Sequence, residues 1–199
     1  MKEELWLRTD ELNEAIKTLD ILKHFLDQVG TDLHFWKWCI IAMHNATQGF
    51  MVCALTGTNG LNVLKKKNAK KWLDALRNNT GDYPEAKMDF FLNLYEKTKG
   101  ERMNLFVSSR SFTPQEQQEE SIRKINELRN TYIHFTPKKW SLYIGGLPSV
   151  LLDCMTYIEF LAFESSNIIY MDEDTEQGLR ANIDRIKKNL SVLDKQYVG

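Results

Sequence analysis

Hydrophobic positions recur every three or four residues along most of the chain, which is the spacing of one face of an α-helix. The pattern predicts amphipathic helices over residues 4–29, 68–78 and 85–98, and a last one after Asp174 or Thr175. Two other segments are apolar on nearly all sides, which is typical of helices buried in a core.

The first of these apolar segments runs from Thr31 to Leu55 and ends near Gly57. The second opens at Pro148, a residue that suits the first turn of a helix, and continues to about Tyr170. We expect both to lie at the centre of the fold.

A further helix is predicted from Thr113 to about Phe135. Thr113 and Glu116 have the spacing of a capping box, Pro114 suits the first helical position, and Pro137 disfavours a continuation. The prediction is therefore one domain, residues 1–199, folded as an all-α bundle of five to seven helices. At most a minor β element is expected, because only residues 105–107 and 140–144 have a short extended pattern.

Composition narrows the class of protein. The chain is 43% hydrophobic and 27% charged with a net charge of -1, so a broadly basic nucleic-acid-binding surface is not expected. No signal-peptide pattern follows Met1, and Asp153 and Glu159 interrupt the apolar window 147–163, so we expect a cytoplasmic protein that does not span a membrane.

No metal or cofactor site is expected. The sequence has no P-loop, no dinucleotide-binding glycine pattern and no zinc-ligand spacing. The three cysteines, Cys39, Cys53 and Cys154, lie in apolar helical segments and are expected to be buried, reduced side chains.

The candidate chemistry lies near the end of the predicted helix 113–135, where Arg129, Asn130 and His134 fall within about a turn and a half. At about 100° per residue, Asn130 and His134 point away from the apolar stripe, and Arg129 sits at its boundary. A buried structural role for His134 is thus disfavoured, which leaves an exposed surface or an interface or cleft.

These residues carry a family resemblance. The run 129–134, Arg-Asn-Thr-Tyr-Ile-His, matches the R-N-x-x-x-H form of the Arg-x4-6-His signature of HEPN domains, and the chain resembles that family over residues 31–56 and 113–170. The resemblance is to a bacterial and plasmid-borne subgroup of these all-helical proteins, many of which are metal-independent ribonucleases of toxin–antitoxin and defence systems.

The resemblance implies roles for three residues. His134 would move protons at the RNA 2′-hydroxyl or the leaving 5′-oxygen, Arg129 would hold the scissile phosphate, and Asn130 would orient His134 or bind substrate. It further implies RNA or a nucleotide as ligand, a homodimer with a composite site, and an antitoxin or other system protein as partner. Two alternatives stay open: a non-catalytic HEPN-like module that binds a nucleotide or a partner protein, and a motif that only dimerises the bundle.

Supporting residues are predicted at two places. His44, Asn45 and Gln48 are polar positions on the apolar helix 31–55, and they either line a cleft beneath the motif helix or form a hydrogen-bonded group in the core. Lys138, Lys139 and Trp140 follow the motif directly and are candidates for RNA contact. The lysines of residues 65–71 are more simply a solvated helix face.

Overall fold

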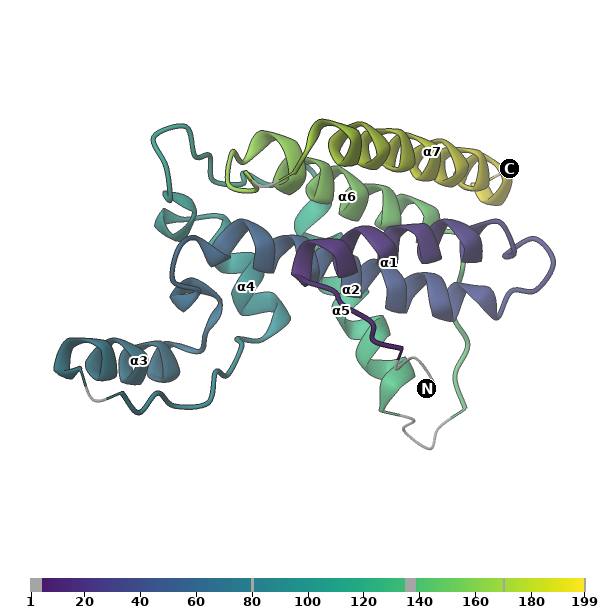
Figure 1. Ribbon diagram of the computed structural model, residues 1–199. Coiled ribbons are helices and arrows are strands. Elements are labelled where there is room, and N and C mark those ends of the chain that lie inside the picture. Colours follow the sequence, from purple (N-terminus) through teal and green to yellow (C-terminus); the bar gives the residue numbers. More distant parts are fainter. Residues whose placement is uncertain (1–4, 80, 135–138, 170, 199) are drawn as a thin grey trace.

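The computed structural model describes residues 5–79, 81–134, 139–169 and 171–198, and these residues form an all-α bundle (Figure 1). Within them lie seven α-helices: α1 (Glu11–Leu26), α2 (Phe35–Thr56), α3 (Lys66–Asn78), α4 (Phe91–Thr98), α5 (Gln118–Ile133), α6 (Leu147–Glu159) and α7 (Glu173–Val198). One π-helical turn and two short 3-10 turns complete them: η3 (Phe160–Glu164), η1 (Leu61–Val63) and η2 (Glu101–Met103). The predicted fold class is confirmed, and the only β feature in the described ranges is one isolated bridge, between Leu64 and Met88.

Helix α2 is the centre of the bundle. It packs against α1, α4, α5 and α6, while α7 covers α6 and α1 on the outside (Figure 1). By length and composition α2 could cross a membrane, but 61% of its apolar window is buried inside the protein, as in the core helix of a soluble protein. The apolarity of the segment is therefore explained by its neighbours.

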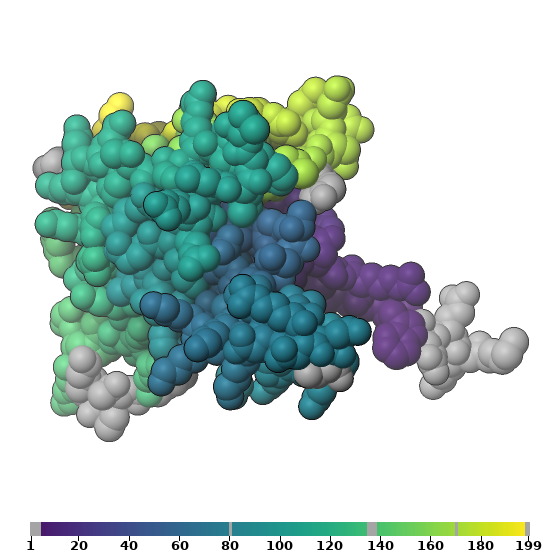
Figure 2. Space-filling view, turned by 90° about the vertical axis from the view of Figure 1, so that its left-hand side faces the viewer, coloured from purple at the N-terminus to yellow at the C-terminus, as the bar shows by residue number. Residues whose placement is uncertain are grey.

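Helices α1 and α2 approach each other very closely at Gly49. A Cβ atom built on Gly49 would lie 2.8 Å from the Cβ of Ala15, which is closer than two carbon atoms can pack without a shift. Helix α1 begins at Glu11, and its N-cap is Asp10, whose carboxylate accepts from the backbone N–H of Asn13 at 2.8 Å. The predicted start at residue 4 is therefore too early, and residues 5–9 project from the body of the molecule (Figure 2).

The predicted start of the motif helix is wrong. Helix α5 begins at Gln118, not at Thr113, and Glu116 has a positive φ of 47°, so no capping box forms. The side chain of Gln118 accepts from the N–H of Gln115 instead. The cause is tertiary: Phe112 is buried and its N–H bonds to the carbonyl of Thr98, which holds the chain outside helical geometry just before the expected start.

Two other helices are shorter than predicted. Residues 85–90 are not helical, because the amide of Asn68 bonds the backbone of Glu85 and Lys87 and the segment pairs with residues 63–65. Helix α6 begins at Leu147 with Pro148 in its first turn, as predicted, but it ends at Glu159 and passes into the π-helical turn.

The cysteines are all free. Cys39 and Cys154 are buried as predicted, whereas Cys53 is only partly buried. Burial raises the thiol pKa of Cys39 to about 12, so this side chain is a small apolar group of the core rather than a nucleophile.

Candidate functional site

The second half of α5 is placed by its apolar stripe. Ile122, Ile125 and Leu128 are buried against α2 and α6, which turns Arg129 and Asn130 toward a hollow between α5, α2 and the start of α4. His134 follows as the C-cap of the helix, with its backbone N–H bonded to the carbonyl of Asn130 at 3.1 Å. Its side chain is exposed, as the helical periodicity predicted.

The hollow, which we call the α5 recess, has a volume of about 470 Å³. Its lining brings together residues from three helices and from the segment before α4: His44, Gln48, Asp89, Phe90, Phe91, Leu92, Asn93, Asn126, Arg129 and Asn130. Two of the three predicted motif residues are thus in the recess, and His134 is not among the residues that line it.

Arg129 is the cation of the recess. Its Nη1 donates to Oδ1 of Asn130 at 3.1 Å, so the two motif residues orient each other along the helix. Its Nε is buried and has no hydrogen-bond partner among the described residues. A buried donor without a partner is costly, and such atoms are often found where a ligand completes the bonding.

His44 forms a wall of the recess. Its ring is 2% exposed, is stacked on Phe91 with the ring centroids 4.1 Å apart, and places Nε2 3.3 Å from Oδ1 of Asn126. Burial, followed by the charge of Arg129, lowers the pKa of His44 to about 4. The imidazole is therefore neutral at pH 7, and His44 is a packing and hydrogen-bonding group rather than an acid that donates protons there.

The carboxylate of the recess is already paired. Asp89 accepts from Lys97 at 2.8 Å, from the side chain of Asn93 at 2.7 Å and from the backbone N–H of Phe90 at 2.9 Å. Burial alone would raise the pKa of Asp89, but these hydrogen bonds and the charge of Lys97 outweigh it and hold the pKa below its usual value. The recess therefore presents one cation and several neutral amides, with its one carboxylate compensated.

The remaining predicted residues lie elsewhere. Asn45 is exposed and lines a different hollow, beside α1, which Gln48 also reaches. Lys139 and Trp140 are exposed, and the ring of Trp140 meets that of Tyr132 edge-on at 4.9 Å. Lys138 lies outside the described residues.

Sequence reasoning missed the side of the recess that precedes α4. Asp89, Phe90 and Asn93 were assigned to a helix with no functional role, and only the fold brings them opposite α5. No signal in the sequence sets Phe90 apart, because it belongs to an apolar run with Phe91 and Leu92. In the structure it is 66% exposed, and Nζ of Lys65 lies 4.0 Å from its ring centroid.

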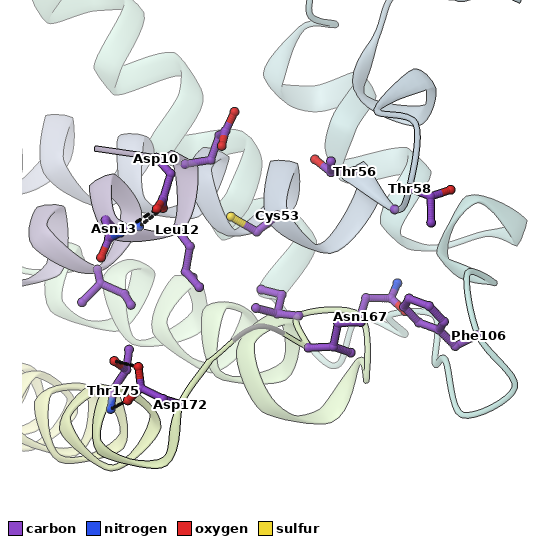
Figure 3. Close-up of a pocket in the computed structure, with 15 residues that line it drawn as sticks. Asp10, Leu12, Asn13, Cys53, Thr56, Thr58, Phe106, Asn167, Asp172 and Thr175 are labelled. Atoms are coloured by element: carbon purple, nitrogen blue, oxygen red, sulfur yellow. Dashed lines mark hydrogen bonds between the residues drawn. The ribbon is translucent and has the colours of Figure 1, made fainter. Parts of the chain in front are cut away.

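A second cavity, of about 430 Å³, lies between the N-terminal ends of α1 and α7 and the C-terminal end of α2 (Figure 3). Asp10 and Asp172 lie on one side of it, and each carboxylate is engaged as a helix cap, while Phe106 lies toward the other side (Figure 3). None of the predicted site residues lines this cavity.

Across the described ranges, no three His, Cys, Asp or Glu side chains are grouped closely enough to hold a metal ion. Comparisons with family models, with curated proteins and with solved structures find no match to this chain. The argument for function therefore rests on the residues of α5 and the recess.

Proposed function

We propose that this protein is a metal-independent endoribonuclease of the HEPN type, with Arg129 and His134 as catalytic residues and Asn130 in support. The observation that carries the proposal is the placement of the motif: Arg129 lies in a formed recess with an unpaired buried Nε, and His134 is exposed at the end of the same helix. A phosphate oxygen is a natural partner for that guanidinium.

The chemistry needs only these side chains. Neutral His134 takes the proton from the RNA 2′-hydroxyl, the 2′-oxygen attacks phosphorus, and the bond from phosphorus to the 5′-oxygen breaks. Arg129 stabilises the charge that grows on the phosphate oxygens, and the leaving 5′-oxygen receives its proton from the imidazolium that His134 has become. The products are a 2′,3′-cyclic phosphate and a 5′-hydroxyl end.

Since His134 does not line the recess of its own chain, the proposed working site is composite. It takes the Arg129 recess from one copy and His134 from a second copy related by a two-fold axis. Apolar side chains near the end of α5 are exposed and suit such a contact. Ile133, next to His134 in the chain, is 39% exposed, and Trp140, whose ring meets that of Tyr132, is 41% exposed.

Cleavage of a mixed-sequence RNA in EDTA tests the proposal. His134→Ala and Arg129→Ala should each lose at least about a hundredfold in rate, the scale of removing a general base or an oxyanion donor, without loss of helicity. His24→Ala is the control, because His24 is an exposed histidine on α1 far along the chain from the motif. Normal cleavage by both motif variants would refute the assignment.

A second candidate is a non-catalytic HEPN-like module that binds a nucleotide or a partner protein. The observation that favours this binding module is that one chain contains a recess lined by Arg129 but does not place His134 in that recess. The two candidates differ in one assay, because the binding module retains RNA or nucleotide in calorimetry and produces no cyclic phosphate.

A further inference from the structure

On the α5 side of the recess, the side-chain groups left without a hydrogen-bond partner among the described residues are mainly donors. Asn130 uses its Oδ1 to accept from Arg129, and Asn126 has its Oδ1 against Nε2 of His44. In both side chains the amide NH₂ makes no hydrogen bond to the described part of the chain. The α5 side of the recess therefore offers two amide donors, from Asn126 and Asn130.

The acceptors lie on the α2 and α4 sides of the recess. Asp89 accepts from Lys97, Asn93 and a backbone N–H, and Lys97 compensates its charge. Asn93 spends one amide hydrogen on Asp89, which leaves its Oδ1 as an acceptor at the rim. The recess thus suits a planar ligand edge that presents a carbonyl oxygen to the amide donors of α5.

The rim supplies a flat apolar contact. Phe90 is 66% exposed although it lines the recess, which is an unfavourable position for a phenyl ring in water. Phe91, in contrast, is covered by His44. An exposed ring beside a hollow of about 470 Å³ with two amide donors fits an unpaired nucleobase, which stacks through its face and is read along its edge.

We propose that the α5 recess is a base-reading subsite that selects keto bases, guanine and uracil, over amino bases, adenine and cytosine. The amides of Asn126 and Asn130 donate to the base carbonyl, and Phe90 stacks on the ring. Guanine and uracil present carbonyl oxygens where adenine and cytosine present an exocyclic amine, which would face the amide donors unpaired. This inference rests on the proposed function for the identity of the ligand as RNA.

Calorimetry with the full chain and the four ribonucleoside 5′-monophosphates tests it, with inorganic phosphate as a fifth ligand. GMP and UMP should bind about tenfold more tightly than AMP and CMP, the scale of one good base contact. Asn126→Asp keeps the oxygen that faces His44 and replaces the donor by an acceptor. The ratio of the affinity for GMP and UMP to the affinity for AMP and CMP should therefore fall to about one or invert. The ratio is compared rather than the affinity, because the added charge weakens all four phosphates alike.

Asn104→Asp is the matched control. It adds the same charge at an exposed position after η2, outside the recess, and the ratio should stay at its original value. Phe90→Ala, at a position that is 66% exposed, should weaken all four nucleotides by about tenfold and leave phosphate unaffected. This variant keeps the proposal testable if Asn126→Asp does not fold.

Equal affinities for all four nucleotides, or for nucleotides and phosphate, would overturn the proposal, as would an unchanged ratio in folded Asn126→Asp. Monophosphates contain no scissile bond, so the measurement does not depend on cleavage. Selective binding by a chain that cuts no RNA would support the subsite and refute the ribonuclease, whereas cleavage without selective binding would do the reverse.

Discussion

The pH dependence of stability is a quantitative test of the position of His44 beside Arg129. The pKa of His44 is lowered from 6.5 to about 4 in the folded protein, because its ring is buried and then because Arg129 is near. Between these values the unfolded chain binds a proton that the folded chain does not. The contribution of His44 is therefore fully present above about pH 6.5 and is lost as the pH falls toward 4.

The size of the loss follows from the two pKa values. At about 1.4 kcal/mol for each pH unit, a fall from 6.5 to about 4 corresponds to about 3 kcal/mol, which is a large share of the stability of a domain of this size. His44→Gln removes the titrating group and retains a polar side chain that can bond Asn126. The free energy of unfolding of the wild type should therefore fall more steeply with acid than that of the variant.

Urea unfolding followed by circular dichroism at several pH values between 7 and 4 measures the difference. Subtracting the variant from the wild type cancels the contribution of the carboxylates, and the remainder should change by about 3 kcal/mol over this range. His24→Gln is the control for loss of an imidazole at an exposed position. Parallel pH profiles for the wild type and His44→Gln would show that the ring is not buried beside a cation, and the geometry of the recess would be wrong.

Two further predictions address the recess and the core. Arg129→Gln removes the cation that disfavours the imidazolium form of His44. The pKa of His44 should therefore rise from about 4 but stay below 6.5, because burial is the larger cause. NMR titration of the ring measures this pKa, and an unchanged value would contradict the effect of Arg129 on His44. Gly49→Ala should destabilise the protein by about 1–3 kcal/mol, because its Cβ would meet that of Ala15 at 2.8 Å. Ala15→Gly in the same chain should restore most of this loss in thermal unfolding, and a stabilising Gly49→Ala would show that α1 and α2 are not in close contact.

The hydrophobic periodicity predicts most of the helices, because each helix depends mainly on the pattern within its own segment. The central position of α2, the outward direction of His134 and the start of α6 near Pro148 all follow from patterns within one helix. Helix ends that depend on distant contacts were predicted incorrectly. The capping pattern at Thr113 gave way to the burial of Phe112, and the expected helix over residues 85–90 gave way to the hydrogen bonds of Asn68.

The candidate site likewise combines residues that local patterns predict with residues that only the fold brings together. Helical spacing alone indicates that Arg129 and Asn130 share a region of α5. The polar interruptions at His44 and Gln48 left two interpretations open, a cleft beneath the motif helix or a polar group in the core, and the structure places both residues in the recess. No local pattern places Asp89, Phe90 and Asn93 opposite α5, since they are about 40 residues away in sequence and are brought there by the segment before α4. The side of the recess that contains Phe90, the proposed stacking residue, therefore could not be predicted without the structure.

The central claim is that Arg129 of one copy acts with His134 of another, and subunit mixing tests it directly. Arg129→Ala and His134→Ala chains are unfolded together, refolded at equal concentration and assayed for RNA cleavage in EDTA. If the site is composite, half of the randomly assorted dimers contain one intact site of two, and the mixture should regain about a quarter of the wild-type rate. A mixture no more active than either variant alone would contradict the composite site.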